Sequence, residues 1–199
     1  MRCVEPHVSE ADAIQFFERP RFGNLYGLLR PKRSVSSAGK RLPFAELVWL
    51  PHYLIELRVT SRRGPGAITV SVEAHAGAFA VIDSHEALTQ QPDQKNTFPP
   101  RLDQEHAVKI GRKELLRSIM RRRGQRNKPL IQETLGVSMF HYPFWVYYYE
   151  RRPGRLDIKI LDAVAKQPGR AKTKVGVLSA LTEASEASRH ALSDPRQPT

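Results

Sequence analysis

Apolar and polar residues alternate along residues 45–60, with apolar side chains largely at every second position. These are Val48, Leu50, Tyr53, Ile55, Leu57 and Val59. Such a period of two is typical of a β-strand with one buried face. A Gly-Pro-Gly turn at residues 64–66 follows, and the alternation continues over residues 67–73 and, after Gly77, over residues 79–82. The first half therefore predicts three strands of one antiparallel meander.

The second half shows the same order of strand, turn and strand. Residues 136–152 and 155–164 are apolar and β-branched or aromatic, and they flank an Arg-Pro-Gly-Arg turn at residues 152–155. Further on, Val175, Val177, Leu178 and Leu181 predict a terminal strand or helix. Residues 183–199 are small and polar and are expected to form a flexible tail.

Helix signals precede each of these two regions. Ser9 is placed to cap a short helix that ends before Pro20. Asp103 is placed to cap a longer helix that runs to about Arg123. The longer helix has an apolar stripe at spacings of three and four, formed by Ala107, Val108, Leu115, Leu116, Ile119 and Met120.

The two β regions are similar enough to indicate an internal repeat. Each holds a proline among aromatic residues, then paired arginines, a glycine turn and a strand that ends in an acidic residue and alanine. The offsets are 143 − 51 = 92 at the proline and 162 − 73 = 89 at the acid. We expect an α+β fold of two tandem helix-plus-antiparallel-meander repeats packed side by side. The expected boundaries are residues 1–83, a linker at 84–100, residues 101–182, and the tail at 183–199.

The residues at the end of the second predicted strand, 72–77, are similar to a motif of a known family. Residues 72–77 read Val-Glu-Ala-His-Ala-Gly, and the second copy reads Leu-Asp-Ala from residue 161 but has Lys166 in place of the glycine. In this order of elements the chain resembles the PepSY-like family. The resemblance implies small non-catalytic α+β modules, often in secreted or envelope proteins, that inhibit or regulate partner proteins.

Charge and composition narrow the function classes. The 199 residues carry a formal net charge of +12, and residues 101–150 and 151–199 each contribute 10 − 5 = +5. No apolar run approaches the roughly 20 residues of a membrane-spanning helix, and acidic residues interrupt the N-terminus where a signal peptide would be apolar. Together with a single cysteine, these features favour a cytoplasmic protein without membrane insertion.

A basic cluster is the main electrostatic feature. It comprises Arg121, Arg122, Arg123, Arg126 and Lys128. Such a cluster binds phosphate backbones without reading sequence. It is equally typical of a solvated helix C-terminus, where cations complement the helix dipole. Both interpretations stay open at this point.

Aromatic residues crowd the strand that follows. Residues 140–149 contain seven of them, and Tyr147 and Tyr149 are expected on the face opposite Tyr148. One interpretation is core and inter-repeat packing. The other is a surface on which Trp145, Tyr147 and Tyr149 stack nucleic-acid bases beside Arg151 and Arg152.

The chain shows no coherent catalytic or metal-binding set. Its seven histidines are scattered, and no zinc, P-loop or dinucleotide motif is present. Glu73 and His75 have the spacing of one strand face and allow a weak hypothesis of acid/base or metal chemistry; a solvent-facing strand edge is the alternative. We therefore expect a non-enzymatic binding or regulatory module without cofactor. Its partner is an unknown protein or, alternatively, nucleic acid.

Overall fold

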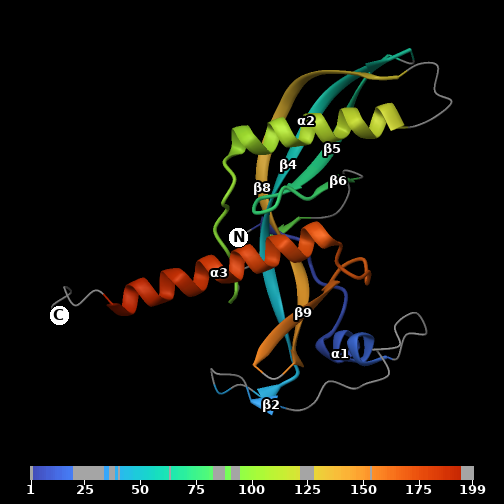
Figure 1. Ribbon diagram of the computed structural model, residues 1–199. Coiled ribbons are helices and arrows are strands. Elements are labelled where there is room, and N and C mark those ends of the chain that lie inside the picture. The colour runs from blue at the N-terminus through green and yellow to red at the C-terminus, as the bar shows by residue number, and fades with distance from the viewer. Residues whose placement is uncertain are drawn as a thin grey trace.

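A computed structural model describes residues 2–19, 34–35, 39, 41–62, 64–82, 88–90, 95–121, 128–152 and 154–193 (Figure 1). The helices in this part of the chain are α1 (Glu10–Glu18), α2 (Gln104–Arg121) and α3 (Ala171–Ser193). The strands are β1 (Arg2–Cys3), β2 (Ser34–Val35), β3 (Arg41–Leu42), β4 (Phe44–Ser61), β5 (Gly64–Glu73), β6 (Phe79–Ile82), β7 (Thr89–Gln90), β8 (Leu130–Arg152) and β9 (Arg155–Asp162). The predicted α+β class is confirmed.

Two long strands, β4 and β8, form the centre of the main sheet. They pair antiparallel from Phe44 opposite Tyr148 to Thr60 opposite Leu130. β5 and β6 continue the sheet beyond one end of β4, and β9 pairs with the opposite end of β8. The predicted antiparallel meander of the first half is therefore present. β8 begins at Leu130 rather than at residue 136, because it extends to pair with the end of β4.

Helices cover both faces of this sheet. Ile55 and Leu57 on β4 pack against α2, and Leu47, on the same face by strand alternation, packs in the cluster that holds α1. Val48 and Leu50 point to the opposite face, where they pack against Val177 and Ala180 of α3. None of the helices in the described residues is long and apolar enough to span a lipid bilayer.

Each of the first two helices packs across β4 and β8, and its contacts reach the hairpin of the other half as well as the strand that follows the helix. Ala13 and Phe17 of α1 are buried against Trp145 and Tyr147 of β8. The buried positions of α2, including Leu115 and Ile119, pack against β4 and β5. The expectation of two self-contained repeats, residues 1–83 and 101–182, did not include this exchange, because the pattern of a helix shows its apolar face but not the surface that covers it.

The same hydrogen bonds recur around both hairpins. The Ala74 N–H donates to the Pro51 carbonyl at 2.9 Å, and the Ala163 N–H donates to the Pro143 carbonyl at 3.2 Å. The turn that follows closes with the Gly77 N–H on the Glu73 carbonyl and with the Lys166 N–H on the Asp162 carbonyl, both at 3.1 Å. Gly77 and Lys166 also share a positive φ, 66° and 54°. Lys166 therefore adopts the conformation of the glycine that it replaces.

The contacts of the helix N-termini recur as well. The Tyr53 hydroxyl donates to the Leu102 carbonyl at 2.8 Å, just before α2, and the Trp145 indole Nε1–H donates to the Val8 carbonyl at 2.8 Å, just before α1. These positions are related by 145 − 53 = 92 and 102 − 8 = 94. Leu50 and Tyr142 are also 142 − 50 = 92 apart and are cross-strand partners. An approximate twofold axis through this pair therefore exchanges the two hairpins.

Two of the expected boundaries need correction. Residues 183–193 are the second half of α3 rather than tail, because the helix continues past the last apolar residue in contact with the sheet. The last residues of the expected linker, 84–100, pack against the sheet. The Phe98 side chain is buried against β4 and β8, and the Trp49 N–H donates to the Asn96 carbonyl at 3.0 Å. Residues 84–87 and 91–94 lie outside the described part of the chain.

The two long-range hydrogen bonds made by Tyr53 and Trp145 allow a test of whether the contacts of α2 and α1 stabilise the protein independently. Tyr53→Phe is expected to lower the free energy of unfolding by about 1 kcal/mol, the usual contribution of one hydrogen bond. Trp145→Phe is expected to cost about 2 kcal/mol, because the smaller ring also leaves a void under α1. Since the two sites are separate, the double variant is expected to show the sum of the losses in urea unfolding. A loss much larger than the sum would contradict two independent contacts.

Candidate functional site

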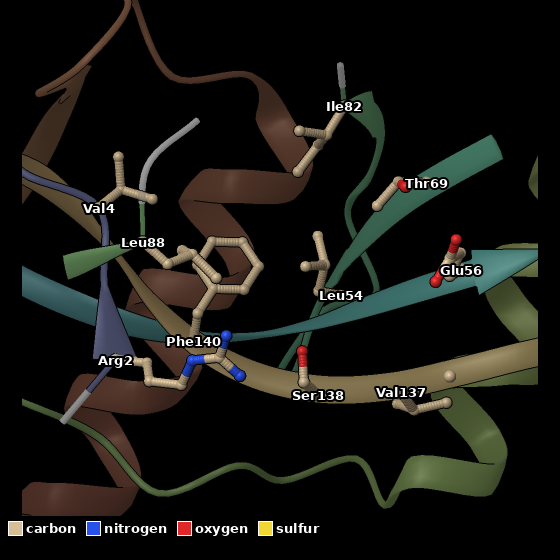
Figure 2. Close-up of a pocket in the computed structure, with 11 residues that line it drawn as sticks. Arg2, Val4, Leu54, Glu56, Thr69, Ile82, Leu88, Val137, Ser138 and Phe140 are labelled. Carbon is tan, nitrogen blue, oxygen red and sulfur yellow. The ribbon is translucent and has the colours of Figure 1, made fainter. Parts of the chain in front are cut away.

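The described residues form a pocket of about 550 Å³ beside β4 and β8 (Figure 2). It lies on the α3 face of the sheet, but on the end that α3 does not cover. We call it the open groove and define it by six of its lining residues: Arg2, Val4, Leu54, Glu56, Thr69 and Phe140. Its size is in the range of sites that take a small molecule or the anchor residues of a peptide.

Strand alternation produces the floor of the open groove. Leu54 and Glu56 follow each other on one face of β4, and Thr69 on β5 lies opposite Glu56. On the other side, Phe140 of β8 lies two residues beyond Ser138, which pairs with Leu54. β1 adds Val4 and Arg2, because it runs parallel to β8 beside His141. The floor is therefore apolar in the centre and polar along its margins.

Opposite charges stand at the two ends of the open groove. Figure 2 shows Arg2 at one end and Glu56 at the other. Both residues are exposed. Strand alternation places Glu56 on the same face of β4 as Val48 and Leu50, but beyond the part of that face that α3 covers. This arrangement suits a ligand with an apolar body and a dipole or opposite charges at its ends.

The open groove is the twofold equivalent of the seat of α3. The α3 seat is formed by Val48, Val146 and Ile158, among others. Adding 92 to residues 48 and 54 gives 140 and 146, and adding 89 to residue 69 gives 158. Phe140, Leu54 and Thr69 therefore occupy the positions of Val48, Val146 and Ile158. One of two equivalent surfaces carries a helix of this chain, and on the other the described residues place no helix.

Glu73 and His75, for which the sequence allowed acid/base or metal chemistry, are buried and have structural contacts. Neither residue lies on a solvent-facing edge: Glu73 is 0% exposed and His75 6%. The two Glu73 carboxylate oxygens accept the His75 and Ala76 N–H groups, each at 2.6 Å, and so stabilise the turn after β5. Burial raises the Glu73 pKa. Helix α3 covers the carboxylate so closely that a Cβ on Gly176 would lie 2.7 Å from Glu73 Oε2.

The histidine ring beneath α3 has few polar neighbours. Both His75 ring nitrogens are buried without a hydrogen-bond partner, and Glu183 Oε2 of α3 lies 3.7 Å from Nδ1. Arg101 reaches the same carboxylate at 3.6 Å and donates to the Ser179 hydroxyl at 3.0 Å. This cluster fixes α3 on the sheet. The described residues contain no group of three or more His, Cys, Asp and Glu side chains that could hold a metal ion.

A second, half-buried histidine, His52, lies on the face of the open groove. His52 Nδ1 and the Ser71 hydroxyl are 2.9 Å apart, and His52 Nε2 is shielded from solvent without a hydrogen-bond partner. Burial, and secondarily the nearby His141, lower the His52 pKa to about 3. The ring is therefore neutral at physiological pH.

The predicted stacking surface is wrong in its main members. Tyr147 is 1% exposed and Trp145 8%, because α1 covers both, and the Phe17 ring stacks on Tyr147 with centroids 4.9 Å apart. Tyr149 is partly exposed, but its hydroxyl donates to Asp157 at 3.1 Å and Lys159 Nζ lies 5.1 Å from its ring centroid. Core packing, the alternative interpretation, accounts for Trp145 and Tyr147.

The predicted basic residues do not form one patch. Arg121 ends α2 and Lys128 precedes β8, where its Nζ donates to the Met120 carbonyl at 3.3 Å. Arg151 and Arg152 are exposed at the other end of the same 23-residue strand. At about 3.3 Å per residue, the path along this 23-residue strand is roughly 70 Å long, so the two pairs lie at opposite ends of the sheet. Figure 1 shows that β8 curves along this path. Arg122, Arg123 and Arg126 lie outside the described residues.

Sequence reasoning did not find the open groove. Leu54, Glu56 and Thr69 had only the ordinary alternation of a strand, and Arg2 and Val4 carried no signal at all. The internal repeat was the relevant sequence signal, because α3 follows the second copy and no helix in the described residues occupies the equivalent surface of the first copy. That inference also needs the face on which α3 packs, which only the structure provides.

Comparisons of the chain with protein-family models, curated proteins and solved structures find no match.

Proposed function

We propose that this chain is a non-enzymatic binding module that holds a segment of a partner protein in the open groove. The observation that supports the proposal is the twofold equivalence between this groove and the seat of α3. The strand positions that seat a helix in one half of the molecule recur in the other half, where none of the described helices covers them. The resemblance to PepSY-like modules points in the same direction, since it implies regulation of partner proteins.

The chemistry of the open groove fits recognition of a polypeptide. Leu54 offers partly exposed apolar surface for an anchor side chain, and Thr69 adds a polar group at the margin. Phe140 and Val4, which are 1% and 5% exposed, form the buried apolar base beneath it. The exposed charges of Arg2 and Glu56 would set the orientation of the ligand more than its affinity. We propose a reducing compartment such as the cytosol, because the single cysteine, Cys3, is a buried free thiol.

A peptide-display selection against the full-length protein tests this proposal. We expect selected peptides whose binding falls more than about tenfold in Leu54→Asp, because the new carboxylate lies in the apolar floor. Leu156→Asp is the matched control, since Leu156 is 55% exposed on β9 and outside the groove. The measurement is fluorescence polarisation with both purified variants, after equal thermal unfolding has shown that they are folded. Selected peptides that are insensitive to Leu54→Asp would refute the proposal.

Nucleic-acid binding is the second candidate, supported by the net charge of +12 and by exposed arginines at both ends of β8. After the burial of Trp145 and Tyr147, it depends on phosphate contacts alone. If it holds, replacing Arg121, Arg122 and Arg123 by alanine would reduce the slope of log K against log salt by up to about 3 for duplex DNA. Oligonucleotide binding that disappears at near-physiological salt in the wild-type protein would reject this candidate.

A further inference from the structure

The outer face of α2 combines exposed apolar and basic side chains. The helix packs on the sheet through buried residues spaced four apart, so its opposite face points away from the sheet (Figure 1). On that face, Leu116 is 51% exposed and Met120 58% exposed, and a spacing of four makes them neighbours on the helix surface. Lys113, three residues before Leu116, and Arg121, directly after Met120, are exposed as well. The C-terminal half of α2 therefore presents an apolar pair beside cations.

The same surface continues onto the start of β8. Lys128 Nζ donates to the Met120 carbonyl at 3.3 Å and lies 3.6 Å from the Met120 sulfur. Leu130, two residues farther along the chain, is 71% exposed. Arg112 of α2 donates to the Gln132 carbonyl at 2.7 Å, so the end of α2 lies beside the start of β8, as Figure 1 shows. We define the α2 tip by six exposed residues: Lys113, Leu116, Met120, Arg121, Lys128 and Leu130.

The α2 tip lies in the most basic part of the chain. Residues 104–128 hold nine lysines and arginines and two glutamates, so their formal charge is 9 − 2 = +7 of the total +12. Both glutamates form ion pairs within α2, Glu105 with Lys109 at 2.8 Å and Glu114 with Arg117 at 2.6 Å. Among the described residues, no ion pair involves a cation of the α2 tip. These cations are therefore available to an external anion.

The six residues between Arg121 and Lys128 lie outside the described part of the chain. Their sequence is Arg-Arg-Gly-Gln-Arg-Asn, which contains three cations and no acidic or large apolar side chain. They add positive charge to this end of the molecule and bring no group that would neutralise it. The exposed fractions of Leu116, Met120 and Leu130 show that their side chains are accessible in the folded chain.

Apolar side chains beside cations suit the surface of an anionic membrane. There, Leu and Met side chains enter the boundary between headgroups and acyl chains, and Lys and Arg contact the anionic headgroups. Nucleic acids offer the same phosphate chemistry, but phosphate contacts make no use of exposed Leu and Met side chains. The outer side of a helix is also convex, whereas a protein usually holds apolar anchor residues of a partner in a concave site. The three apolar residues therefore favour a lipid surface.

We infer that the α2 tip docks this protein on anionic membranes, with Leu116, Met120 and Leu130 at the level of the headgroups and the surrounding cations on lipid phosphates and carboxylates. The docking is peripheral, because the buried face of α2 stays on the sheet. The inference does not depend on the proposed function. The open groove lies on the α3 face and α2 covers the opposite face, so both sites can be occupied at once.

Co-sedimentation of the full-length protein with vesicles tests the inference. The probes are phosphatidylcholine vesicles with and without about 30% phosphatidylserine, at near-physiological salt. Binding is expected only to the vesicles that contain phosphatidylserine. Lys113→Gln combined with Arg121→Gln is expected to weaken it more than about tenfold, because each cation near an anionic surface contributes about fivefold. Arg151→Gln combined with Arg152→Gln removes the same charge at the other end of β8 and is expected to bind like the wild type.

A second pair of variants tests the apolar contribution at constant charge. Leu116→Ser combined with Met120→Ser is expected to weaken binding to phosphatidylserine vesicles about fivefold, because less apolar surface leaves water. The matched control is Val175→Ser combined with Leu178→Ser, which changes two exposed apolar residues of α3 and is expected to have no effect. Equal thermal unfolding shows that all variants are folded. Vesicle binding that is the same in both serine variants would mean a purely electrostatic attraction and would overturn the inference.

Two further comparisons separate this inference from the functions proposed above. Binding to an oligonucleotide but not to phosphatidylserine vesicles, at the same salt, would overturn membrane docking and support the nucleic-acid candidate. Leu54→Asp is expected to bind vesicles like the wild type. A protein that binds vesicles through the α2 tip but selects no peptide dependent on Leu54 would keep this inference and lose the proposed function. The reverse result would keep the proposed function alone.

Discussion

Val177→Asp is expected to lower the free energy of unfolding by more than about 3 kcal/mol and to release α3 from the sheet. Val177 is 0% exposed and packs among Val48, Leu50 and Phe144. A carboxylate at this position would be buried without a partner charge or hydrogen bond, which is among the most destabilising single changes known in proteins. Urea unfolding measures the loss, and amide hydrogen exchange along α3 shows whether the helix has come away.

The neighbouring residue provides the matched control. Leu178 is also an apolar residue of α3, but it is 42% exposed. Leu178→Asp introduces the same charge at an exposed position, where the main cost is the lower helix propensity of Asp, so it is expected to lower the free energy of unfolding by only about 0.5 kcal/mol. Equal losses in the two variants would mean that α3 is not seated on the sheet as described. The equivalence that supports the proposed function would then be lost.

Acidification is expected to destabilise the protein through His52. Its pKa is about 3 in the folded protein, against an ordinary value of 6.5 in the unfolded chain. Below pH 6.5 the unfolded chain therefore binds a proton that the folded protein does not, and the free energy of unfolding falls as pH falls towards 3. Each pKa unit corresponds to about 1.4 kcal/mol, and the unfolded imidazole is half protonated at pH 6.5, so this group lowers the free energy of unfolding by about 2 kcal/mol between pH 6.5 and 4.5. Urea unfolding across this range measures the slope.

A variant isolates the contribution of His52. His52→Asn keeps a side-chain polar group near the Ser71 hydroxyl but cannot titrate, so its stability is expected to fall less steeply in acid. His7→Asn, at an exposed position, is expected to keep the wild-type slope. Glu73 acts in the opposite direction: its raised pKa means that the folded protein binds the extra proton, so stability from this group falls as pH rises above 4.5. Comparing variants at the same pH cancels this term. A wild-type slope in His52→Asn would contradict the assignment.

Local sequence patterns predicted the elements of this fold well. Asp103 accepts the His106 N–H at 2.8 Å at the start of α2, as a capping residue should. The predicted stripe of α2 was correct for Ala107, Leu115 and Ile119, which are buried, but Leu116 and Met120 are 51% and 58% exposed. The predicted stripe was therefore wider than the face of α2 that the sheet covers. Such edges depend on the neighbouring surface, which periodicity does not describe.

Long-range contacts were the part that could not be predicted. The aromatic run around Trp145 was compatible with a core or with a binding surface, and the choice depended on α1, which lies more than a hundred residues earlier in the chain. The basic residues were also close together in sequence at each end of β8, but the length of that strand keeps the two groups apart. In both cases the sequence showed the chemistry of the side chains, and the topology decided what they could reach.

The exchange of α1 and α2 between the hairpins has a consequence for how this chain folds. The hydrogen bond from Trp145 to Val8 spans 137 residues, and the second hairpin must therefore form before α1 can complete its contacts, which also include Leu47 of β4. On the ribosome, the first hairpin emerges well before α2, and its apolar face is uncovered until then. Closing such long loops is slow and leaves hydrophobic strands exposed to aggregation. We therefore expect the chain to behave as one late-forming cooperative unit, and neither half is an independent folding domain.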